Sequence, residues 1–499
     1  MEVMTLRVTN SLTGEREAFE PADPESVLLY YCGLTTSDPA HLGHARGWVH
    51  VDVMHRWLSW LGYEVRHVEN FTDVNEKIVA RVGEAGDSER EVARSYIRDI
   101  IRDMRSLNLL RAEVYPRVSE HLPEIIALIE RLVERGYAYE SAGSVYFDVT
   151  AFDEYGKLSN QDIDEIEAQG ASDEQAEKRN PEDFALWKGG GVDPAEIAEH
   201  RHDAAAPAEE AVRTAQTWES PWGDGRPGWH IECSAMSMTH LDETIDIHVG
   251  GQDLVFPHHE NELAQSEAAT GHTFARYWLH VRLLDAADEE KMSSSLGNFE
   301  TVAEAIEHHG TDVVRTFLLS TAYHNPATYS RETVAEAAQR WDRLRRGYER
   351  AVDATDSVDA GSKAEDELLR EAVETTRDRF EAALNDDFNT RKGLTALGDL
   401  VSAVHTHVDD RKEYDYRGLR TAVETLKEFG GGVLGLSFGT AAEDGTVELA
   451  EELVELVLDV REQEREAGNF ERADALRDDL AALGIEVQDT EDGVEYRFE

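Results

Sequence analysis

Residues 26–62 read SVLLYYCGLTTSDPAHLGHARGWVHVDVMHRWLSWLG, and this stretch decides the fold. Residues 26–32 form an apolar, β-rich run of strand length, which predicts a strand. A loop of Gly, Thr, Ser, Asp and Pro at 33–39 leads into a segment with apolar residues at helical spacing, which stops near Gly62. The next strand is predicted at 64–68. Strand, loop, helix and strand in this order form a βαβ unit, which predicts a parallel nucleotide-binding sheet.

The rest of the chain divides into segments of different composition. The sequence YAYESAGSVYFDV, from residue 137, predicts a hairpin in an insertion, and strand-like sequence at 244–249 and 277–284 should rejoin the first sheet. After about residue 302 the pattern is helical almost throughout. We therefore expect a first half of the core at 1–136, an insertion at 137–225, a second half at 226–310, a helical region at 311–345, a helical bundle at 346–438 and a small C-terminal domain at 447–499.

Part of the insertion has an unusual composition. Residues 189–216 are rich in Ala, Glu and Gly and poor in large apolar side chains. Such a segment buries little apolar surface, so it predicts a mobile surface loop or a short solvated helix without chemistry.

The chain is strongly acidic. Its 499 residues include 103 acidic and 49 basic side chains, which give a formal net charge of −54 at pH 7. The acidic residues are scattered, which predicts an acidic surface and not an acidic tail. Molar salt, in which the Debye length falls to about 3 Å, would screen such a surface, so we expect a halophilic protein. No apolar run approaches a membrane span and the N-terminal segment does not resemble a signal peptide, so we expect a cytoplasmic protein that contacts no membrane.

Two short segments have the residues of a phosphate site. His41 and His44 stand at i and i+3 on the predicted first turn of a helix, where backbone N–H groups favour phosphate and the imidazoles can donate to an α-phosphate. Gly43 between them would let a nucleotide base lie against the backbone. Lys291, in KMSSS at 291–295, can neutralise charge on a departing pyrophosphate. Without the downstream loop, the two histidines would be read as surface residues at a helix start; a solvated loop is the alternative for Lys291, which a chain so acidic and poor in lysine disfavours.

A third segment, GGQDLVFPHHENELAQSEA at 250–268, contains residue types that bind metals. His258 and Glu262 are i and i+4 on a predicted helix and share one face. With the chain's only cysteines, Cys32 and Cys233, they would form a set of two sulfurs, one nitrogen and one oxygen, which suits zinc. In the same segment, Asp253 can accept from ribose hydroxyls. Spacing alone leaves open an ordinary helix-surface pair and two inert thiols.

Taken together, these segments resemble the cysteinyl-tRNA synthetases, a family of class I aminoacyl-tRNA synthetases. The resemblance runs from about residue 27 to the C-terminus, and the pair GWHIECSAM and FPHHENE is highly specific for this family within the class. The further segments that support it are ENFTDVNEKI, RNPEDFALWK, KMSSSLGNF, FLLSTAYHNP, LNDDFNT and NFERADALRDDLAALGIEVQDT.

The resemblance implies a fold and a reaction. The implied fold is a Rossmann-type α/β catalytic core split by an insertion, followed by an α-helical anticodon-binding bundle and a small C-terminal unit. The implied reaction joins the carboxylate of L-cysteine to the α-phosphate of ATP, with release of pyrophosphate. It then transfers the cysteinyl group to the terminal ribose of tRNA(Cys). Magnesium would accompany ATP, and the family suggests a monomer.

The resemblance also implies roles for particular residues. One zinc ion per chain would be held by the positions that match Cys32, Cys233, His258 and Glu262, and would bind the substrate thiolate. The amino acid pocket would be lined by Thr72, Trp229 and His248. The ATP site would include Gly43, Asp253, Lys291 and Ser294, and the catalytic residues would be His41, His44 and Lys291.

The chain departs from the family pattern at several points. Ser294 stands where the family's KMSKS loop has its second lysine, so Lys291 would have a larger share in holding the phosphates. Leu34 replaces a usual proline and Ser37 a usual tyrosine, and the family has no expected counterpart of 189–216. Two other functions stay open on the sequence alone, which are a related ligase that transfers cysteine to an amino sugar and a catalytically silent tRNA-binding paralogue.

Overall fold

A computed structural model describes residues 5–162, 174–286 and 300–438, together with parts of 454–498. The chain forms two compact units, Met1–Leu436 and Ser437–Glu499. Among the described residues, no helix is long and apolar enough to cross a membrane.

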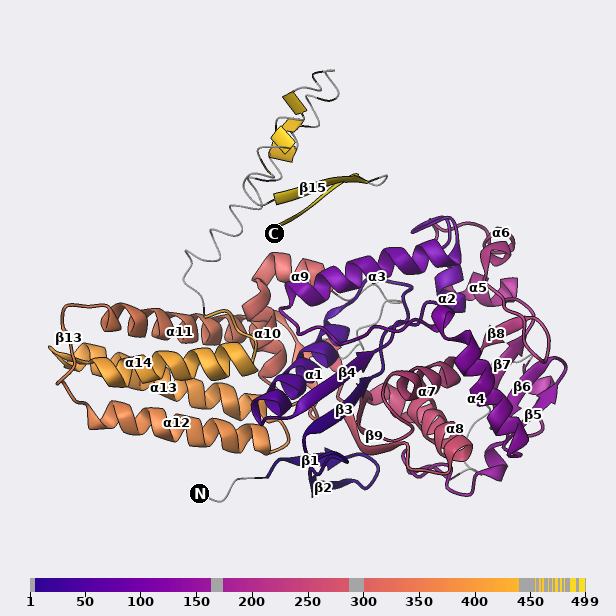
Figure 1. Ribbon diagram of the computed structural model, residues 1–499, viewed down its shortest axis with the longest axis horizontal. Coiled ribbons are helices and arrows are strands. Elements are labelled where there is room, and N and C mark those ends of the chain that lie inside the picture. Colours follow the sequence, from indigo (N-terminus) through magenta and orange to yellow (C-terminus); the bar gives the residue numbers. More distant parts are fainter. Residues whose placement is uncertain are drawn as a thin grey trace. The chain divides into compact units, whose positions relative to one another are not determined.

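A four-stranded parallel sheet forms the centre of the first unit (Figure 1). Its strand order is β10-β9-β3-β4, with β3 at Ser26–Tyr31, β4 at Glu64–Glu69, β9 at Ile245–Gly251 and β10 at Ala275–Val281. Helix α1 (Leu42–Trp60) crosses from β3 to β4, which confirms the predicted βαβ unit. The chain then returns on the other side of β3, as β9. Between β3 and β9 the strand order therefore reverses, and ligands of such sheets bind beyond the carboxyl ends of the strands at this point.

The insertion between β4 and β9 includes its own antiparallel sheet, which is formed by β5 (Ala138–Ser141), β6 (Ser144–Phe147), β7 (Phe184–Gly189) and β8 (Gly225–Pro227). The predicted hairpin is β5–β6. The helices before the second half of the core are α2 (Glu76–Val79), α3 (Glu89–Ser106), α4 (Leu122–Glu134), α5 (Pro194–His200) and α6 (Ala208–Ala211). Those of the second half are α7 (Trp229–His240) and α8 (Glu260–Thr270).

The sequence predicted a mobile surface loop or a short solvated helix at 189–216, and the structure has two short helices there that are partly buried. Asp193 caps α5 by accepting from the backbone N–H of Ala195, and Pro194 begins the helix. Ile197 on α5 and Ala211 on α6 are buried in an apolar cluster that also includes residues of α2 and α3. Alanine side chains are small enough to pack closely against that surface, so a segment with few large apolar residues nevertheless buries part of its surface.

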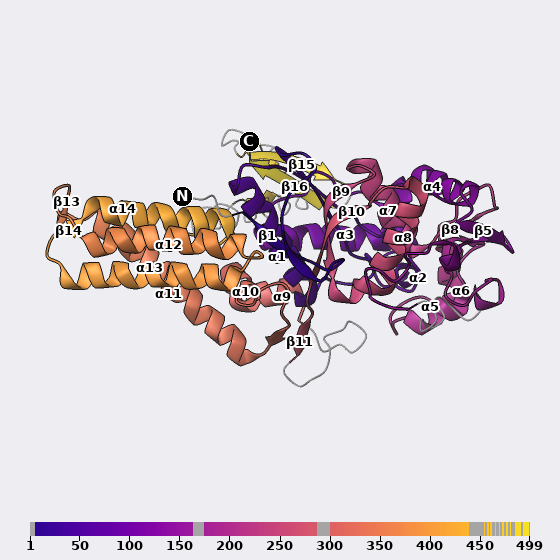
Figure 2. The ribbon, with the colours of Figure 1, turned by 90° about the horizontal axis from the view of Figure 1, so that it is seen from below.

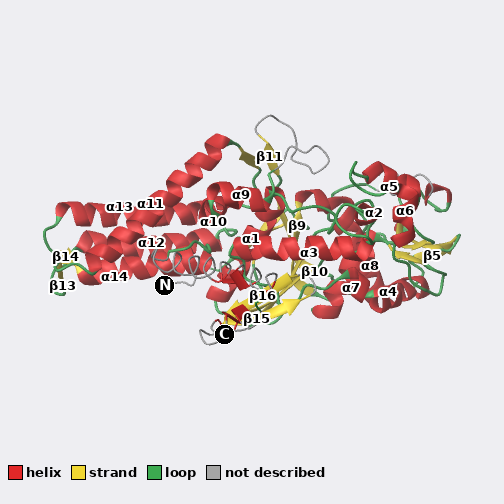
Figure 3. Cartoon of the chain, turned by 90° about the horizontal axis from the view of Figure 1, so that it is seen from above, coloured by secondary structure: helices red, strands yellow, loops and turns green. Residues whose placement is uncertain are grey.

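After the core the chain is mainly helical (Figures 2 and 3). Its helices are α9 (Val302–His309), α10 (Thr311–Leu319), α11 (Arg331–Thr355), α12 (Glu367–Asn385), α13 (Thr390–Asp410), α14 (Tyr416–Thr425) and a π-helix at Leu426–Val433. The short strands are β1 (Arg7–Asn10), β2 (Glu15–Ala18), β11 (Leu284–Ala286), β12 (Ala327–Tyr329), β13 (Ala360–Gly361) and β14 (Tyr414–Asp415), and the second unit includes β15 (Ile485–Thr490) and β16 (Gly493–Phe498). The boundary expected between 345 and 346 falls inside α11, whose buried face is continuous, so one helix belongs to both expected segments.

A buried arginine joins the core to the end of the helical bundle. Arg315 on α10 donates from Nη2 to Asp52 Oδ2 on α1 at 2.6 Å and to the backbone oxygen of Leu434 at 2.6 Å. Its Nη1 donates to the backbone oxygen of Leu107, just after α3, at 2.7 Å. The side chain is fully buried. Buried charges are stable only when they are paired and hydrogen-bonded, so this joint fixes α1, α3 and the bundle relative to one another.

Candidate metal centre and nucleotide site

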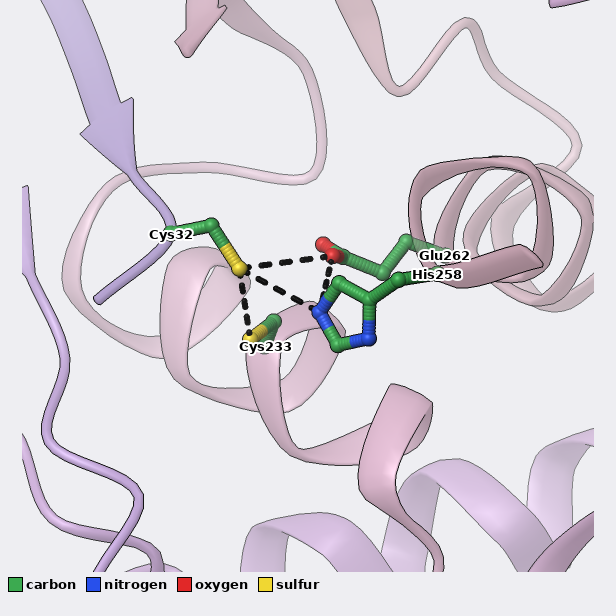
Figure 4. A group of neighbouring side chains, drawn as sticks. All are labelled: Cys32, Cys233, His258 and Glu262. Atoms are coloured by element: carbon green, nitrogen blue, oxygen red, sulfur yellow. Dashed lines mark hydrogen bonds and ion pairs between the residues drawn. The ribbon is translucent and has the colours of Figure 1, made fainter. Parts of the chain in front are cut away.

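Four residues from distant parts of the sequence meet beyond the carboxyl end of β3 (Figure 4). Cys32 directly follows β3, and Cys233 lies on the second turn of α7. His258 lies in a π-helical turn after β9, and Glu262 on the first turn of α8. All four are buried, and their ligand atoms lie within 4.8 Å of one another. This buried Cys/His/Glu cluster is compatible with a metal site.

The distances in the cluster suit a small four-coordinate ion. The Sγ of Cys32 lies 3.4 Å from the Sγ of Cys233, 3.2 Å from the Nε2 of His258 and 3.8 Å from the Oε1 of Glu262. The Nε2 of His258 lies 2.9 Å from the Oε1 of Glu262. A tetrahedral zinc site requires ligand separations of about 3.4–3.8 Å, so each of these four pairs is within about 0.5 Å of that geometry.

Neighbouring histidines orient two of the four side chains. The Nδ1 of His258 lies 2.9 Å from the Nδ1 of His230, which leaves Nε2 towards the sulfurs. The second carboxylate oxygen of Glu262, Oε2, lies 3.0 Å from the Nε2 of His248. Such outer hydrogen bonds fix the orientation of metal ligands in many proteins. The family resemblance implied that His248 lines the pocket, whereas His230 was not predicted, although it stands in the same WHIEC segment as Cys233.

The charges in the cluster favour a cation. Burial opposes ionisation of Glu262, but His248 and His258 hold the pKa of its carboxyl down at about 2. A hydrogen bond from Cys32 lowers the pKa of the Cys233 thiol to about 7, whereas the same bond and burial raise the pKa of Cys32. Burial also opposes protonation of His258, but the carboxylate of Glu262 raises its pKa to about 10. The carboxylate of Glu262 and the thiol of Cys233, whose pKa values are both lowered, thus lie together in one buried place and can supply negative charge to a cation.

The residues expected to line an amino acid pocket lie around this cluster. The ring of Trp229, at the start of α7, is 4.4 Å from the ring of His258 between centroids, and this side chain is 41% exposed. His248 on β9 is fully buried and stacks on Trp278. Thr72 follows β4, is buried, and its Oγ1 accepts from the Nδ2 of Asn70 at 3.4 Å. Of these three residues, only Trp229 is exposed to solvent.

Asn70 was missed by sequence reasoning. Its Oδ1 accepts from the hydroxyl of Tyr30 at 3.0 Å and from the backbone N–H of Gly33 at 2.9 Å, and it lies 3.8 Å from the Sγ of Cys233. A Cβ at Gly33 would lie 1.6 Å from the backbone oxygen of Asn70. The end of β3 and the end of β4 thus approach each other closely here, and glycine is required for that approach.

The histidines of the HLGH segment form the N-terminal cap of α1. The Nδ1 of His41 accepts from the backbone N–H of Gly43 at 3.1 Å, and the Nδ1 of His44 accepts from the backbone N–H of His41 at 3.3 Å. Burial and the neighbouring His41 lower the pKa of His44. A neutral imidazole that accepts at Nδ1 has its proton on Nε2, so each ring offers an Nε2–H donor. The two rings stack at 3.7 Å between centroids.

The structure shows a further reason why residue 43 is a glycine. A Cβ at this position would lie 2.8 Å from the Cε1 and 2.9 Å from the Nδ1 of His41. Any side chain here would therefore displace the capping imidazole. The expectation that a nucleotide base lies against Gly43 stays a prediction.

Of the remaining residues expected at the nucleotide site, the structure describes only Asp253. Asp253 lies beyond the end of β9 and is exposed. Lys291 and Ser294 lie outside the described residues. The chain after them returns to the HLGH segment, because the backbone N–H of Val302 donates to the oxygen of Ala40 at 2.9 Å. The described chain therefore resumes beside HLGH, at residues 300–302.

The chain is similar to known proteins over its whole length. Residues 18–339 match the family described as "tRNA synthetases class I (C) catalytic domain", residues 379–439 match the "DALR domain", and residues 447–497 match the "Cysteinyl-tRNA ligase anticodon binding domain". A cysteine–tRNA ligase of Haloarcula marismortui is 74% identical over 99% of this chain and all of its own length. The relative of the same description from Halobacterium salinarum is 62% identical over the same shares, and that from Thermococcus gammatolerans is 41% identical over 99% of both chains.

Solved structures agree on the fold. A methionyl-tRNA synthetase of Mycobacterium tuberculosis bound by methionyl-adenylate has a TM-score of 0.59 at 16% identity, over 82% of this chain and 92% of its own. A putative arginyl-tRNA synthetase of Campylobacter jejuni has a TM-score of 0.57 at 13% identity, over 84% and 95%.

These relatives decide between the functions that the sequence left open. The match to an anticodon-binding domain at 447–497 does not support an amino-sugar ligase, and neither it nor the full-length relatives support a silent paralogue. The two most similar of these relatives come from halophiles, which agrees with the net charge of −54. The chain belongs to the cysteine–tRNA ligases, a family of class I aminoacyl-tRNA synthetases that act on an amino acid, ATP and tRNA.

Proposed function

We propose that Cys32, Cys233, His258 and Glu262 hold one zinc ion, and that this ion selects the substrate of the enzyme. The observation that carries the proposal is the burial of two thiols, one imidazole and one carboxylate with all ligand atoms within 4.8 Å. Two sulfur ligands favour zinc over magnesium or calcium, which prefer oxygen. The bound zinc would supply a Lewis acid that binds a thiolate far better than a hydroxyl, and thereby separates cysteine from serine.

The proposed pocket places the substrate between the cluster and Trp229. His230 and His248 would keep the side chains of His258 and Glu262 oriented to hold the ion, which would supply the Lewis acid for the substrate thiolate. Thr72 and His248 would line the buried side of the pocket and Trp229 its solvent side. A small apolar pocket alone cannot reject serine strongly, because the two substrates differ by one atom.

We further propose that ATP binds across the start of α1. The Nε2–H groups of His41 and His44 would donate to the oxygens that gain charge when the cysteine carboxylate attacks the α-phosphate. Asp253 would accept from the ribose hydroxyls, and Gly43 would lie against the base. For Lys291 and Ser294, which lie outside the described residues, pyrophosphate contacts remain a prediction, as does magnesium with ATP.

The remaining assignments concern partners. We propose tRNA(Cys) as the acceptor, because the relatives are cysteine–tRNA ligases and an anticodon-binding domain matches 447–497. The transfer would leave the cysteinyl group on the terminal ribose and release AMP. A monomer and a cytoplasmic location stay predictions from the sequence.

The decisive experiment compares cysteine with serine in pyrophosphate exchange and in tRNA charging, in molar KCl. We expect exchange with cysteine and not with serine, one zinc per chain, and loss of both activities in Glu262→Gln. Glu260→Gln is a matched control because Glu260, two residues earlier, accepts from the backbone of 156–159 and lies outside the cluster. Equal exchange with serine, or full activity without bound metal, would contradict the proposal.

A further inference from the structure

Helix α3 has a row of arginines on its solvent side. Of its residues, Arg90, Arg94, Arg98, Arg102 and Arg105 are all exposed. The first four follow one another at intervals of four residues, so they lie along one face and about 6 Å apart in axial rise. We call these five residues the α3 arginine face.

The α3 arginine face is largely without internal partners. Arg102 pairs with Asp99 at 2.9 Å, in a contact where both side chains are substantially exposed. Among the residues that the structure describes, no carboxylate pairs with Arg90, Arg94, Arg98 or Arg105. Two arginines of α11 differ, since the exposed Arg346 pairs with Asp342 and the half-buried Arg345 pairs with Asp342 and with Glu349.

This arrangement is unfavourable for the helix by itself. Like charges at i and i+4 destabilise a helix by roughly 0.2–0.5 kcal/mol for each pair. The face has three such pairs, and only Glu91 and Asp99 among its exposed or half-exposed neighbours on α3 are acidic. In a chain with 103 acidic and 49 basic residues, a local excess of positive charge runs against the composition. The negative charges of a bound polyanion would neutralise these arginines and so offset the repulsion among them.

Helix α3 runs from near the proposed amino acid pocket to near the helical bundle, so it could contact an RNA that binds at both places (Figure 1). At its first residue, Glu89 accepts from the backbone N–H of Asn75, three residues beyond Thr72 of the proposed pocket. At its other end, the backbone oxygen of Leu107 accepts from Arg315, which joins the core to the bundle. The opposite face of α3 is buried through Val92, Ile97 and others, so the arginines point outward from a fixed support.

We propose that the α3 arginine face binds the sugar–phosphate backbone of the tRNA, between the part that enters the catalytic site and the part that reaches the helical bundle. Guanidinium groups at regular spacing bind phosphates without reading bases. The face therefore contributes to affinity and to the salt dependence of binding, and not to the choice of tRNA or to the formation of the adenylate.

The test is the salt dependence of tRNA binding by Arg94→Gln/Arg98→Gln. Each lost phosphate contact lowers the slope of log K against log[salt] by about 0.7–0.9, so the double variant should lose about 1.4–1.8. Between 2 M and 0.5 M KCl, its affinity deficit relative to the parent protein should therefore grow about tenfold. Cysteine-dependent pyrophosphate exchange without tRNA should be unchanged.

The matched control is Arg16→Gln/Arg131→Gln. These two arginines are partly exposed and paired, with Asp386 and Glu243 respectively, and neither lies on the α3 arginine face. The control removes the same charge and should keep the parent slope. An unchanged slope in the α3 variant, an equal change in the control, or a parallel loss of pyrophosphate exchange would each overturn the proposal. So would a change in self-association of the α3 variant without a change in tRNA binding.

Discussion

Replacing Arg315 by methionine should destabilise the first unit by about 3–5 kcal/mol, the usual cost of breaking a buried ion pair by removing one partner. The side chain donates to Asp52 and to the backbone oxygens of Leu434 and Leu107, and methionine can donate to none of them. Buried acceptors left without a donor account for much of this cost, at about 1–3 kcal/mol each. Arg56 also donates to Asp52, at 2.9 Å, so that carboxylate keeps one partner.

The expected shift in melting temperature follows from the size of the unit. At about 2.1 cal/mol/K per residue, the 436 residues of Met1–Leu436 give an unfolding entropy of about 0.9 kcal/mol/K. A loss of 3–5 kcal/mol then lowers the melting temperature by about 3–5 °C.

The assay is thermal unfolding followed by circular dichroism, in 2 M KCl and again in 3 M KCl. The shift should be similar at both concentrations, because salt screens buried pairs little. Arg420→Met is the control, since Arg420 forms an exposed i,i+4 pair with Glu424. It should change the melting temperature by less than about 1 °C. A shift as small as that in Arg315→Met would refute the account of the buried joint.

Two further changes test the site and the core. Gly43→Ala should lower the turnover of cysteine-dependent pyrophosphate exchange about tenfold or more with unchanged zinc content, because its Cβ would lie 2.8 Å from His41 Cε1 and displace the cap. Parent-like turnover would show that the cap is not needed. Burial, with a contribution from His55, lowers the pKa of His67 to about 3 in the folded protein. In the unfolded chain the same imidazole is protonated below about pH 6.5, so between these two pH values only the unfolded state binds the proton. The stability that this group provides above pH 6.5 is lost as the pH falls towards 3. His67→Leu should therefore reduce the slope of unfolding free energy against pH, between 6.5 and 5, by about 1.1 kcal/mol per unit on average, as measured by urea unfolding. An unchanged slope would mean that His67 is protonated in the folded protein.

The sequence predicted the central sheet well because its signals are local. The run at 26–32, the loop at 33–39 and the helical spacing that follows each depend on neighbouring residues, and the structure has β3 and α1 there. The helical C-terminal half was predicted for the same reason. The N-terminal hairpin β1–β2 was missed, since a strand such as Glu15–Ala18, with sequence EREA, lacks alternation and β-branched residues.

Contacts between distant residues were beyond local reasoning. Arg315 looks like a surface residue of an amphipathic helix, and its burial depends on Asp52, 263 residues away. Cys32 and Cys233 are 201 residues apart, so the residue types alone left open whether they meet, and the resemblance to a family implied that they do. Asn70 and His230 are single polar residues in buried segments, and no spacing rule distinguishes them. The packing of part of 189–216 was not predicted because the segment has few large apolar residues, although small alanine side chains pack closely there.

The most direct test of the central claim is to replace the metal by cobalt and follow the thiolate-to-cobalt absorption band on addition of cysteine. Two thiolates, from Cys32 and Cys233, should give the band in the free enzyme, and a third from the substrate should raise its intensity by about half. Serine should leave it unchanged. A band that does not respond to cysteine, or that responds equally to serine, would contradict selection of the substrate thiolate by the bound metal.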